Sequence, residues 1–329
     1  MTVPRTADPE AAARVLRAGG LVALPTETVY GLAADAEQPA AVARIYAVKG
    51  RPAGHPVIVH VAAADAVDSW TRAVPGYARN LVAACWPGPL TVVLPRSARA
   101  TDAVTGGQST VALRMPSHPV TLATLAAFAG DSDRGVAAPS ANVFGTVSPT
   151  SVDHVLASIG DRLDPGRDLV LDGGACEVGV ESTIVDCTGP APRLLRPGAV
   201  SVETVEAVTG LAVTAAAGGS VRAPGTLAAH YAPRARVVVT PTTTTEPQVA
   251  AQTGPGSTGL IAPVGVPTPG GFVRLAAPTD ASGYARILYA ALRRADLLGL
   301  QVIVAVPPSG PGIAAAVRDR LDRAAAAGG

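Results

Sequence analysis

The amino-acid sequence predicts an α/β protein made of a larger leading domain and a smaller second domain. Apolar segments of strand length alternate with segments of helical length, which predicts a sheet covered by helices on both faces. The chain has 329 residues, of which 48% are hydrophobic and 16% are charged, so it can bury a large core. The pattern changes near residue 205, and the length fits two domains of about 150 residues each.

The elements of the leading part follow from apolar runs and stop signals. A helix is expected at 9–18, where Gly19 and Gly20 end it ahead of a strand at 21–24. Further strands are expected at 57–61, 89–95, 111–115, 135–139, 168–174 and 182–188, and further helices at 118–130 and 153–160.

The second domain follows a stretch without periodicity. Residues 215–236 are rich in Ala, Gly and Pro, which is typical of a linker. Beyond them, strands are expected at 236–240, 259–263 and 301–306, and helices at 284–299 and 312–327. We therefore divide the chain into a leading domain at 1–205, a linker at 206–236 that enters the active site, and a C-terminal domain at 237–329.

Charge and cysteine usage exclude several classes of protein. The net charge is +1 and no run of like charge occurs, so binding to nucleic acid by bulk electrostatics alone is not expected. The three cysteines are scattered and form no CxxC pair, which indicates a reducing compartment and argues against disulfides and a structural zinc site. Neither a signal peptide nor a membrane span is visible, so we expect a cytoplasmic protein.

Polar side chains gather after the first predicted strand. The segment PTETVYGL carries Thr26 and Thr28 directly after that strand. Strand ends are where α/β proteins place their ligands, so these hydroxyls are candidates for a binding site. The alternative is a polar turn in which the threonines cap the backbone.

A pair of cations and a histidine follow. Lys49, which is the one lysine of the chain, and Arg51 flank Gly50. We expect them on a flexible loop, where they can neutralise phosphates; the alternative is a solvated surface loop. His60 lies within an apolar strand and needs a polar partner there. That partner is either a ligand or another group of the core.

The third group of candidates lies at later strand ends. Arg114 ends an apolar strand and needs an anion, either a ligand carboxylate or a structural Asp or Glu. Thr110 shares its strand face. Ser140, Asn142 and Ser148 are further candidates, with a Ser/Asn turn as the alternative. Glu181, Ser182, Thr183 and Arg196 follow at later strand ends, and the linker residues His230 and Tyr231 pack either on the other domain or on a ligand. The chain has no GxxxxGK[ST] loop, so any ATP is held by a different cradle.

Nine segments in order resemble the YrdC-like threonylcarbamoyl-AMP synthases in their two-domain form. They are LPTETVYGL, IYAVKGRP, HPVIVHV, WPGPLTVVL, VALRMPSHP, APSAN, LDGG, GVESTIVD and LLRPGAV. The linker APGTLAAHYAP resembles the connector of that family, except that Thr226 and Leu227 replace a Met and a cation. The resemblance implies a twisted mixed-sheet YrdC-like domain and a small Rossmann-like C-terminal domain.

The resemblance also implies a reaction. L-Threonine, bicarbonate or CO2, and ATP would give L-threonylcarbamoyl-AMP and pyrophosphate, which makes the enzyme a nucleotidyltransferase. The product would feed the N6-threonylcarbamoyl modification of adenosine 37 in tRNAs that read ANN codons. The implied partners are downstream tRNA threonylcarbamoyl transferase proteins, with a weak contact to tRNA and none to a membrane. Mg²⁺ would be carried on the ATP phosphates, with no metal site on the protein.

The resemblance assigns roles to the candidate residues. Threonine would be bound by Thr26, His60, Arg114 and Ser182. Lys49 and Arg51 would be catalytic. ATP would be bound by Lys49, Arg51, Thr110, Ser140, Asn142, Ser148, Arg196 and Tyr231. The alternatives are an RNA-binding module, a carbamoyl-transfer enzyme of related fold, and a sugar-phosphate enzyme of related fold.

Overall fold

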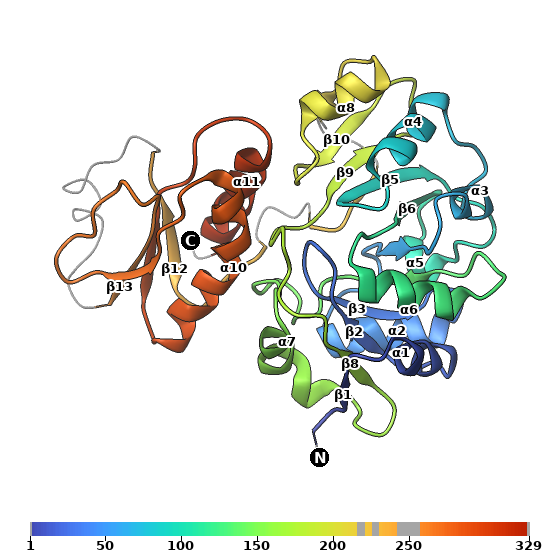
Figure 1. The fold of residues 1–329 in the computed structure, drawn as a ribbon, viewed down its shortest axis with the longest axis horizontal. Helices are drawn as coiled ribbons and strands as arrows, with labels where there is room; N and C mark the ends of the chain where they lie inside the picture. The colour runs from blue at the N-terminus through green and yellow to red at the C-terminus, as the bar shows by residue number, and fades with distance from the viewer. Residues whose placement is uncertain (1, 216–220, 226–229, 242–256, 328–329) are drawn as a thin grey trace.

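Two sheets of unequal size organise the chain in a computed structural model that describes residues 2–215, 221–225, 230–241 and 257–327. Within these residues, the larger sheet has 11 strands in the order β1-β8-β2-β3-β7-β4-β6-β5-β9-β10-β11 (Figure 1). The smaller sheet has 4 strands in the order β12-β15-β13-β14. The larger sheet mixes parallel and antiparallel neighbours, whereas the smaller sheet is parallel throughout. The predicted fold class is confirmed.

The larger domain interleaves strands and helices along the chain, with consecutive strands at β2–β3 and β8–β10. Its strands are β1 (Arg5–Thr6), β2 (Val22–Leu24), β3 (Gly31–Asp35), β4 (Ile58–His60), β5 (Leu90–Pro95), β6 (Thr110–Arg114), β7 (Val136–Ala137), β8 (Leu169–Leu171), β9 (Thr183–Asp186), β10 (Arg193–Arg196) and β11 (Thr214–Ala215). Its helices are α1 (Pro9–Arg17), α2 (Pro39–Lys49), α3 (Ala66–Trp70), α4 (Gly76–Cys85), α5 (Asp102–Thr105), α6 (Pro119–Ala129), α7 (Val152–Ile159), the 3-10 turn η1 (Gly160–Arg162) and α8 (Val202–Thr209).

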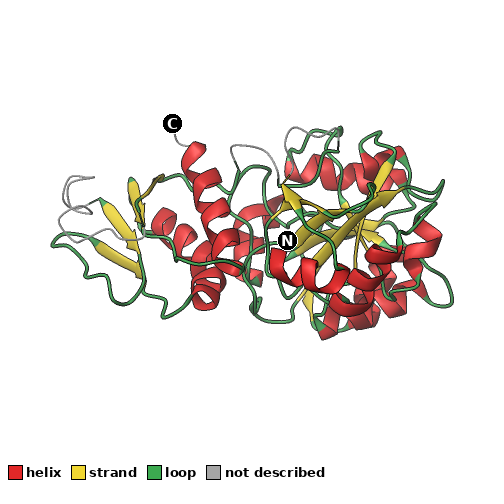
Figure 2. Cartoon of the chain, turned by 90° about the horizontal axis from the view of Figure 1, so that it is seen from above, coloured by secondary structure: helices red, strands yellow, loops and turns green. Residues whose placement is uncertain are grey.

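The smaller domain places its helices toward the larger one. Its elements are β12 (Arg236–Val239), β13 (Thr258–Ile261), β14 (Val273–Ala276), α10 (Ala281–Leu297), β15 (Val302–Ala305) and α11 (Ile313–Ala326). Both views show α10 and α11 between the small sheet and the larger domain (Figures 1 and 2). The two domains therefore meet through helices whose side chains can reach the larger domain.

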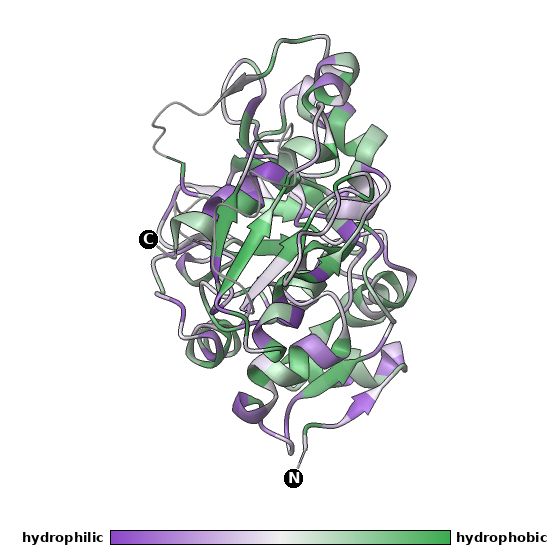
Figure 3. Cartoon of the chain, turned by 90° about the vertical axis from the view of Figure 1, so that its left-hand side faces the viewer, coloured by the Kyte–Doolittle hydropathy of each residue, from purple (hydrophilic) through white to green (hydrophobic). Residues whose placement is uncertain are grey.

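The cores lie where the apolar runs of the sequence predict them. Most strands are hydrophobic (Figure 3), and the larger sheet buries apolar residues in one cluster around Trp70 and Leu113 and another around Leu16 and Phe128. The C-terminal domain has its own core, which also includes Val180 of the larger domain. Among the described residues, no helix is long and apolar enough to cross a membrane.

Helix α2 corrects the prediction that Lys49 lies on a flexible loop. The helix continues to Lys49 and ends at Gly50, which adopts the left-handed conformation with φ of 62° that suits glycine. Lys49 is only 1% exposed and Arg51 only 8% exposed, so the alternative of a solvated loop is wrong as well. Only Arg51, beyond the helix, lies in a loop.

The predicted domain boundaries stay a prediction. Helix α8 runs across residue 205, and β11 pairs with β10 of the larger sheet. The smaller sheet begins with β12 at Arg236. The replaced connector residues Thr226 and Leu227 lie outside the described residues.

Candidate functional site

A small cavity lies between the polar ends of several strands of the larger sheet and the chain that leads to the C-terminal domain. Its free volume is about 50 Å³, which is room for only a few water molecules. It is lined by Thr26, Thr28, Val29, Gly31, Arg51, Ile58, His60, Arg114, Ala138, Pro139, Ser140, Glu181, Ser182, Arg196, Pro224, Gly225, His230 and Tyr231.

The cavity brings together eight of the twelve residues predicted to bind substrate. These are Thr26, Arg51, His60, Arg114, Ser140, Ser182, Arg196 and Tyr231. The eight belong to different strands and loops, so the fold gathers residues that are far apart in the sequence. The remaining four are absent from the lining: Lys49, Thr110, Asn142 and Ser148.

Lys49 and Asn142 support the loop that carries Ser140. The Lys49 ammonium donates to the carbonyl oxygens of Ser140 at 2.5 Å and Asn142 at 2.6 Å. The Asn142 amide in turn donates to the carbonyl oxygens of Val143 and Thr146, both at 2.9 Å. This part of the wall is thus fixed by a buried cation and an amide that lie behind it.

Arg114 has a structural partner that the sequence analysis left open. Its Nη2 donates to Glu27 Oε1 at 2.7 Å, and its Nε donates to the Gly88 carbonyl at 3.3 Å. Glu27 Oε2 accepts a further bond from the Ser117 amide at 3.1 Å. Nη1 of Arg114 donates to no described residue, so this nitrogen is available to a ligand in the cavity.

Three buried cations around the cavity have no carboxylate partner. Among the described residues, no Asp or Glu oxygen lies within 4.0 Å of the charged nitrogens of Lys49, Arg51 or Arg196. Arg196 bonds the Ser182 and Pro224 carbonyls instead, and Arg51 bonds the Pro56 carbonyl. Burial lowers the pKa of all three groups. Buried cations without a counter-ion favour the binding of an anion.

Several buried polar atoms of the lining have no hydrogen-bond partner within the part of the chain that the structure describes. They are Arg51 Nε, His60 Nδ1, His230 Nδ1 and Tyr231 Oη. Buried polar atoms in folded proteins are nearly always bonded, so these four indicate a place prepared for a polar ligand. Burial lowers the pKa of both histidines to about 3, and both rings are therefore neutral at neutral pH.

The linker forms one wall of the cavity and is held on both sides. Arg222 donates to the carbonyl oxygens of Gly54 at 2.8 Å and Gly106 at 2.9 Å. Tyr231 is 1% exposed and stacks on Tyr289 of the C-terminal domain, with ring centres 5.8 Å apart. Among the described residues, Tyr231 is the one non-glycine residue with a positive φ, at 62°. Such a backbone is unusual for a bulky residue and marks a constrained position.

Sequence reasoning missed part of the polar network. Glu27 and Glu181 lie inside quoted motifs, but the sequence does not show which cations they meet. Arg320 and Tyr289 lie in the C-terminal domain and both bond Glu181. No local pattern marks Arg320, because its partner lies 139 residues away in the sequence.

Two family profiles together match most of the chain. The Sua5, YciO and YrdC profile, described as "Telomere recombination", matches residues 14–198. The profile of the threonylcarbamoyl-AMP synthase C-terminal domain matches residues 200–326.

Curated relatives and a solved structure agree with these profiles. The threonylcarbamoyl-AMP synthase of Pyrococcus abyssi is 43% identical over 233 residues, which are 69% of this chain and 66% of that protein. The Bacillus subtilis threonylcarbamoyl-AMP synthase is 41% identical over 242 residues, which are 71% of this chain and 67% of that protein. The chain thus aligns with about two thirds of their length. The crystal structure of P. abyssi Sua5 complexed with L-threonine has a TM-score of 0.86 and 35% identity, and the match covers 99% of this chain and 98% of that one.

Proposed function

Because the chain belongs to the Sua5, YciO and YrdC family and carries the C-terminal domain of threonylcarbamoyl-AMP synthases, we propose that it is an L-threonylcarbamoyladenylate synthase. This nucleotidyltransferase would convert L-threonine, bicarbonate or CO2, and ATP into threonylcarbamoyl-AMP and pyrophosphate. The observation that carries the proposal is the group of buried cations without carboxylate partners around one cavity. Such a site suits a substrate with several negative charges.

We propose that threonine binds at the Arg114 end of the cavity. The free Nη1 of Arg114 would bind the threonine carboxylate while Glu27 holds the other side of the guanidinium. His60 offers an unpartnered Nδ1 for the amine or the hydroxyl, and Thr26 and Ser182 lie on the same lining. The complex of P. abyssi Sua5 with L-threonine supports threonine as the substrate.

The ATP phosphates would lie against Arg51 and Arg196. Ser140 shares this lining, and Lys49 would contribute its charge from behind the loop that it holds. Ser148 lies behind the lining and donates to Glu181, so we assign it a supporting role. Thr110, at the start of β6, is not among the residues that line the cavity, so its position does not support a bond to ATP.

The chemistry requires position and charge more than covalent help. The threonine amine adds to the carbon of CO2, forms the C–N bond and releases a proton. A carbamate oxygen then attacks the α-phosphorus, and the bond to the β-phosphate oxygen breaks so that pyrophosphate leaves. Arg51 and Arg196 would stabilise the charge that develops on the leaving group.

A nucleotide cannot enter while the linker covers the cavity. The free volume of about 50 Å³ is well below the roughly 300–1,000 Å³ of ligand pockets. We therefore propose that the linker segment with His230 and Tyr231 lifts to admit ATP and closes over it. The adenine and the phosphates of the bound ATP would then take the place of the contacts that Tyr231 makes in the present, closed structure.

Mg²⁺ would enter on the ATP phosphates. Among the described residues, no group of three or more His, Cys, Asp and Glu side chains can hold a metal ion. Glu181 is the carboxylate of the lining, and both its oxygens already accept hydrogen bonds. These described residues thus offer no cage for the ion, and we derive no step from it.

The cellular setting is part of the proposal. The product would be consumed by tRNA threonylcarbamoyl transferase proteins, which pass its activated carbamoyl group to adenosine 37. The cysteines Cys85, Cys176 and Cys187 are all free, which is typical of a reducing compartment such as the cytoplasm.

Pyrophosphate release from ATP tests the proposal. We expect release only when threonine and bicarbonate are both present, and a large loss of activity in Arg196→Ala. Arg193→Ala is the matched control, because Arg193 lies on the same strand and pairs with Asp186. Release that continues without threonine would refute the proposal. Salt-dependent RNA binding without ATP turnover would favour the RNA-binding alternative instead.

A further inference from the structure

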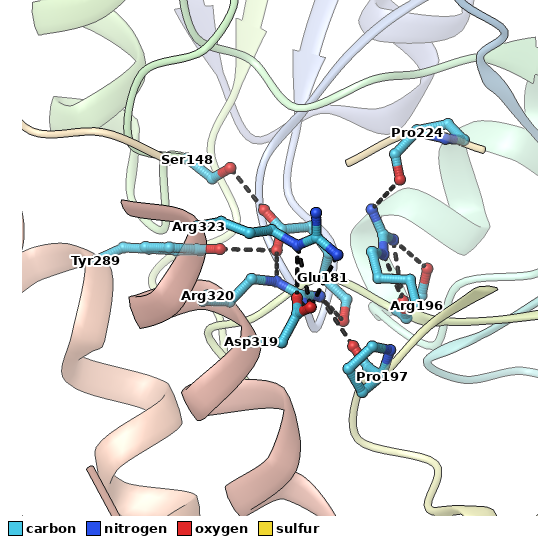
Figure 4. A network of polar contacts seen from close by, with 10 residues as sticks. Ser148, Glu181, Arg196, Pro197, Pro224, Tyr289, Asp319, Arg320 and Arg323 are labelled. Carbon is cyan, nitrogen blue, oxygen red and sulfur yellow. Dashed lines mark hydrogen bonds and ion pairs between the residues drawn. The ribbon is translucent and has the colours of Figure 1, made fainter. Parts of the chain in front are cut away.

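Helix α11 of the C-terminal domain sends one arginine into the larger domain. Arg320 has an exposed fraction of 0%. Its Nε donates to Glu181 Oε2 at 2.8 Å, and its Nη2 donates to the Pro197 carbonyl at 3.0 Å (Figure 4). Pro197 directly follows Arg196, so Arg320 contacts both the carboxylate of the cavity and the strand end that carries a proposed phosphate ligand.

The Glu181 carboxylate is held by three donors. Oε1 accepts from Ser148 at 2.6 Å, while Oε2 accepts from Tyr289 at 2.7 Å and from Arg320. Two of these donors, Tyr289 and Arg320, belong to the C-terminal domain. The smaller domain therefore fixes a charged group of the cavity in the larger domain.

Glu181 lies between two guanidinium groups. Arg320 is on one side and Arg196 on the other (Figure 4). Burial alone would raise the pKa of Glu181, but the charges of Arg320 and Arg196 and the bonds from Ser148 and Arg320 lower it to about 2. With these partners the carboxylate is ionised, and a buried carboxylate needs a cation close to it. After Arg320, Arg196 is the described cation whose charge acts most strongly on Glu181.

The charge of Arg320 is shared with one further carboxylate. Its Nη1 donates to Asp319 at 2.5 Å, and Asp319 also accepts bonds from Arg323 at 3.0 and 3.1 Å. The guanidinium also lies 5.3 Å from the ring centre of Tyr231. Arg320 is therefore fixed on its own helix while it holds Glu181 at the domain interface.

We propose that Arg320 is a positioning residue supplied by the C-terminal domain, which holds the Glu181 carboxylate at the interface and so keeps Arg196 free to bind the ATP phosphates. The inference rests on the proposed function, because it assumes that Arg196 binds phosphate. It gives the C-terminal domain an indirect part in ATP binding, because none of its described residues lies on the cavity lining.

The test compares single and double variants in the full-length protein. In Arg320→Met, the Glu181 carboxylate turns to Arg196, and Arg196 then loses a hydrogen bond to the ATP phosphates. The loss of one hydrogen bond to a charged group should raise the KM for ATP by about tenfold or more. The KM for threonine should change little. Adding Glu181→Gln removes the competing charge, and the double variant should regain most of its ATP affinity. Arg318→Met is the matched control, because Arg318 lies on α11 but bonds Pro308 and Gly310 of its own domain.

The outcomes separate a positioning role from a structural one. A lower melting temperature with unchanged KM for ATP in Arg320→Met would overturn the proposal, and so would a double variant that stays as weak for ATP as the single one. If Arg320→Met does not fold, Arg320→Lys provides the test, since lysine keeps the charge but lacks the fork that bonds two partners. We then expect Arg320→Lys to bind ATP less tightly than the wild type but more tightly than a site in which Glu181 pairs with Arg196, and we expect Glu181→Gln to restore the affinity. The proposal would be overturned if Arg320→Lys binds ATP like the wild type, or if Glu181→Gln does not restore its affinity.

Direct binding keeps this test independent of the reaction. Calorimetric binding of ATP to the wild type and the variants reports the role of Arg320 even if no pyrophosphate is released. Absence of pyrophosphate release by the wild type would refute the proposed function. Equal ATP affinities of the wild type and Arg320→Met would refute the role of Arg320.

Discussion

The buried ion pair between Arg114 and Glu27 allows substrate binding and stability to be tested separately. Arg114 is 4% exposed and Glu27 is 5% exposed, with 2.7 Å between their charged atoms. Replacing Arg114 by Met leaves the Glu27 carboxylate buried and unpaired, which costs about 3–5 kcal/mol of folding stability. It also removes the guanidinium assigned to the threonine carboxylate. Losing the charged partner of the threonine carboxylate costs about 2–5 kcal/mol of binding free energy, or roughly 30- to 4,000-fold in threonine affinity.

The double variant Arg114→Met with Glu27→Gln separates these two effects. It removes both charges, while the amide oxygen of the introduced glutamine can still accept the bond from the Ser117 amide. We expect most of the lost stability to return and the threonine affinity to stay low. Thermal melting reports the first quantity, and the threonine dependence of pyrophosphate release at saturating ATP reports the second.

Two results would refute this reasoning. A threonine KM close to that of the wild type in either variant would exclude the carboxylate role of Arg114. A double variant that melts as low as Arg114→Met would show that the unpaired Glu27 charge is not the cause of the instability. Arg79→Met is the control, because Arg79 and Asp68 form an ion pair whose side chains are more than half exposed, and such pairs contribute little.

Further predictions concern the cation, the linker, the substrate and pH. Lys49→Met loses both bonds to the loop at 140–142, so the KM for ATP should rise in the pyrophosphate assay; an unchanged value would refute its role. Gly225→Ala would place a Cβ 2.3 Å from Tyr231 Oη and 2.8 Å from Arg196 Nη1, so one of these side chains or the linker backbone must move, and ATP saturation curves should differ from those of the wild type. Serine lacks one methyl group, so its kcat/KM should be about 10- to 200-fold below that of threonine but measurable. His60 and His230 have a pKa of about 3 in the folded protein, whereas in the unfolded chain they bind protons below their ordinary pKa of 6.5. The melting temperature should therefore fall as the pH decreases from 6.5 toward 3. A melting temperature that does not change over this range would contradict the burial of the two rings.

The strands were the part of the fold that the sequence predicted best. Uninterrupted apolar runs such as 57–61 and 89–95 mark buried strands whatever their neighbours are, and β4 and β5 lie there. Helix α2 was missed because apolar residues occur around most of its circumference, so it lacks a clear polar face. The burial of Lys49 was also beyond prediction, since lysine is rarely buried unless its charge is paired.

The residues of the candidate site were easier to predict than their partners. Arg114 and Arg196 stand at strand ends, where a cation is conspicuous in an apolar setting. Glu27 and Arg320, by contrast, are recognised only once the chain is folded, because they meet their partners across 87 and 139 residues. Pairing over such separations depends on the order of strands and the docking of domains, and neither follows from local patterns.

One cavity is proposed to hold the amino acid and the nucleotide side by side. A crystal structure with L-threonine and a non-hydrolysable ATP analogue would show where each of them binds. We expect the threonine carboxylate at Arg114, the phosphates at Arg51 and Arg196, and Tyr231 moved from its present place. Ligands bound elsewhere on the protein, or phosphates that contact neither Arg51 nor Arg196, would contradict it.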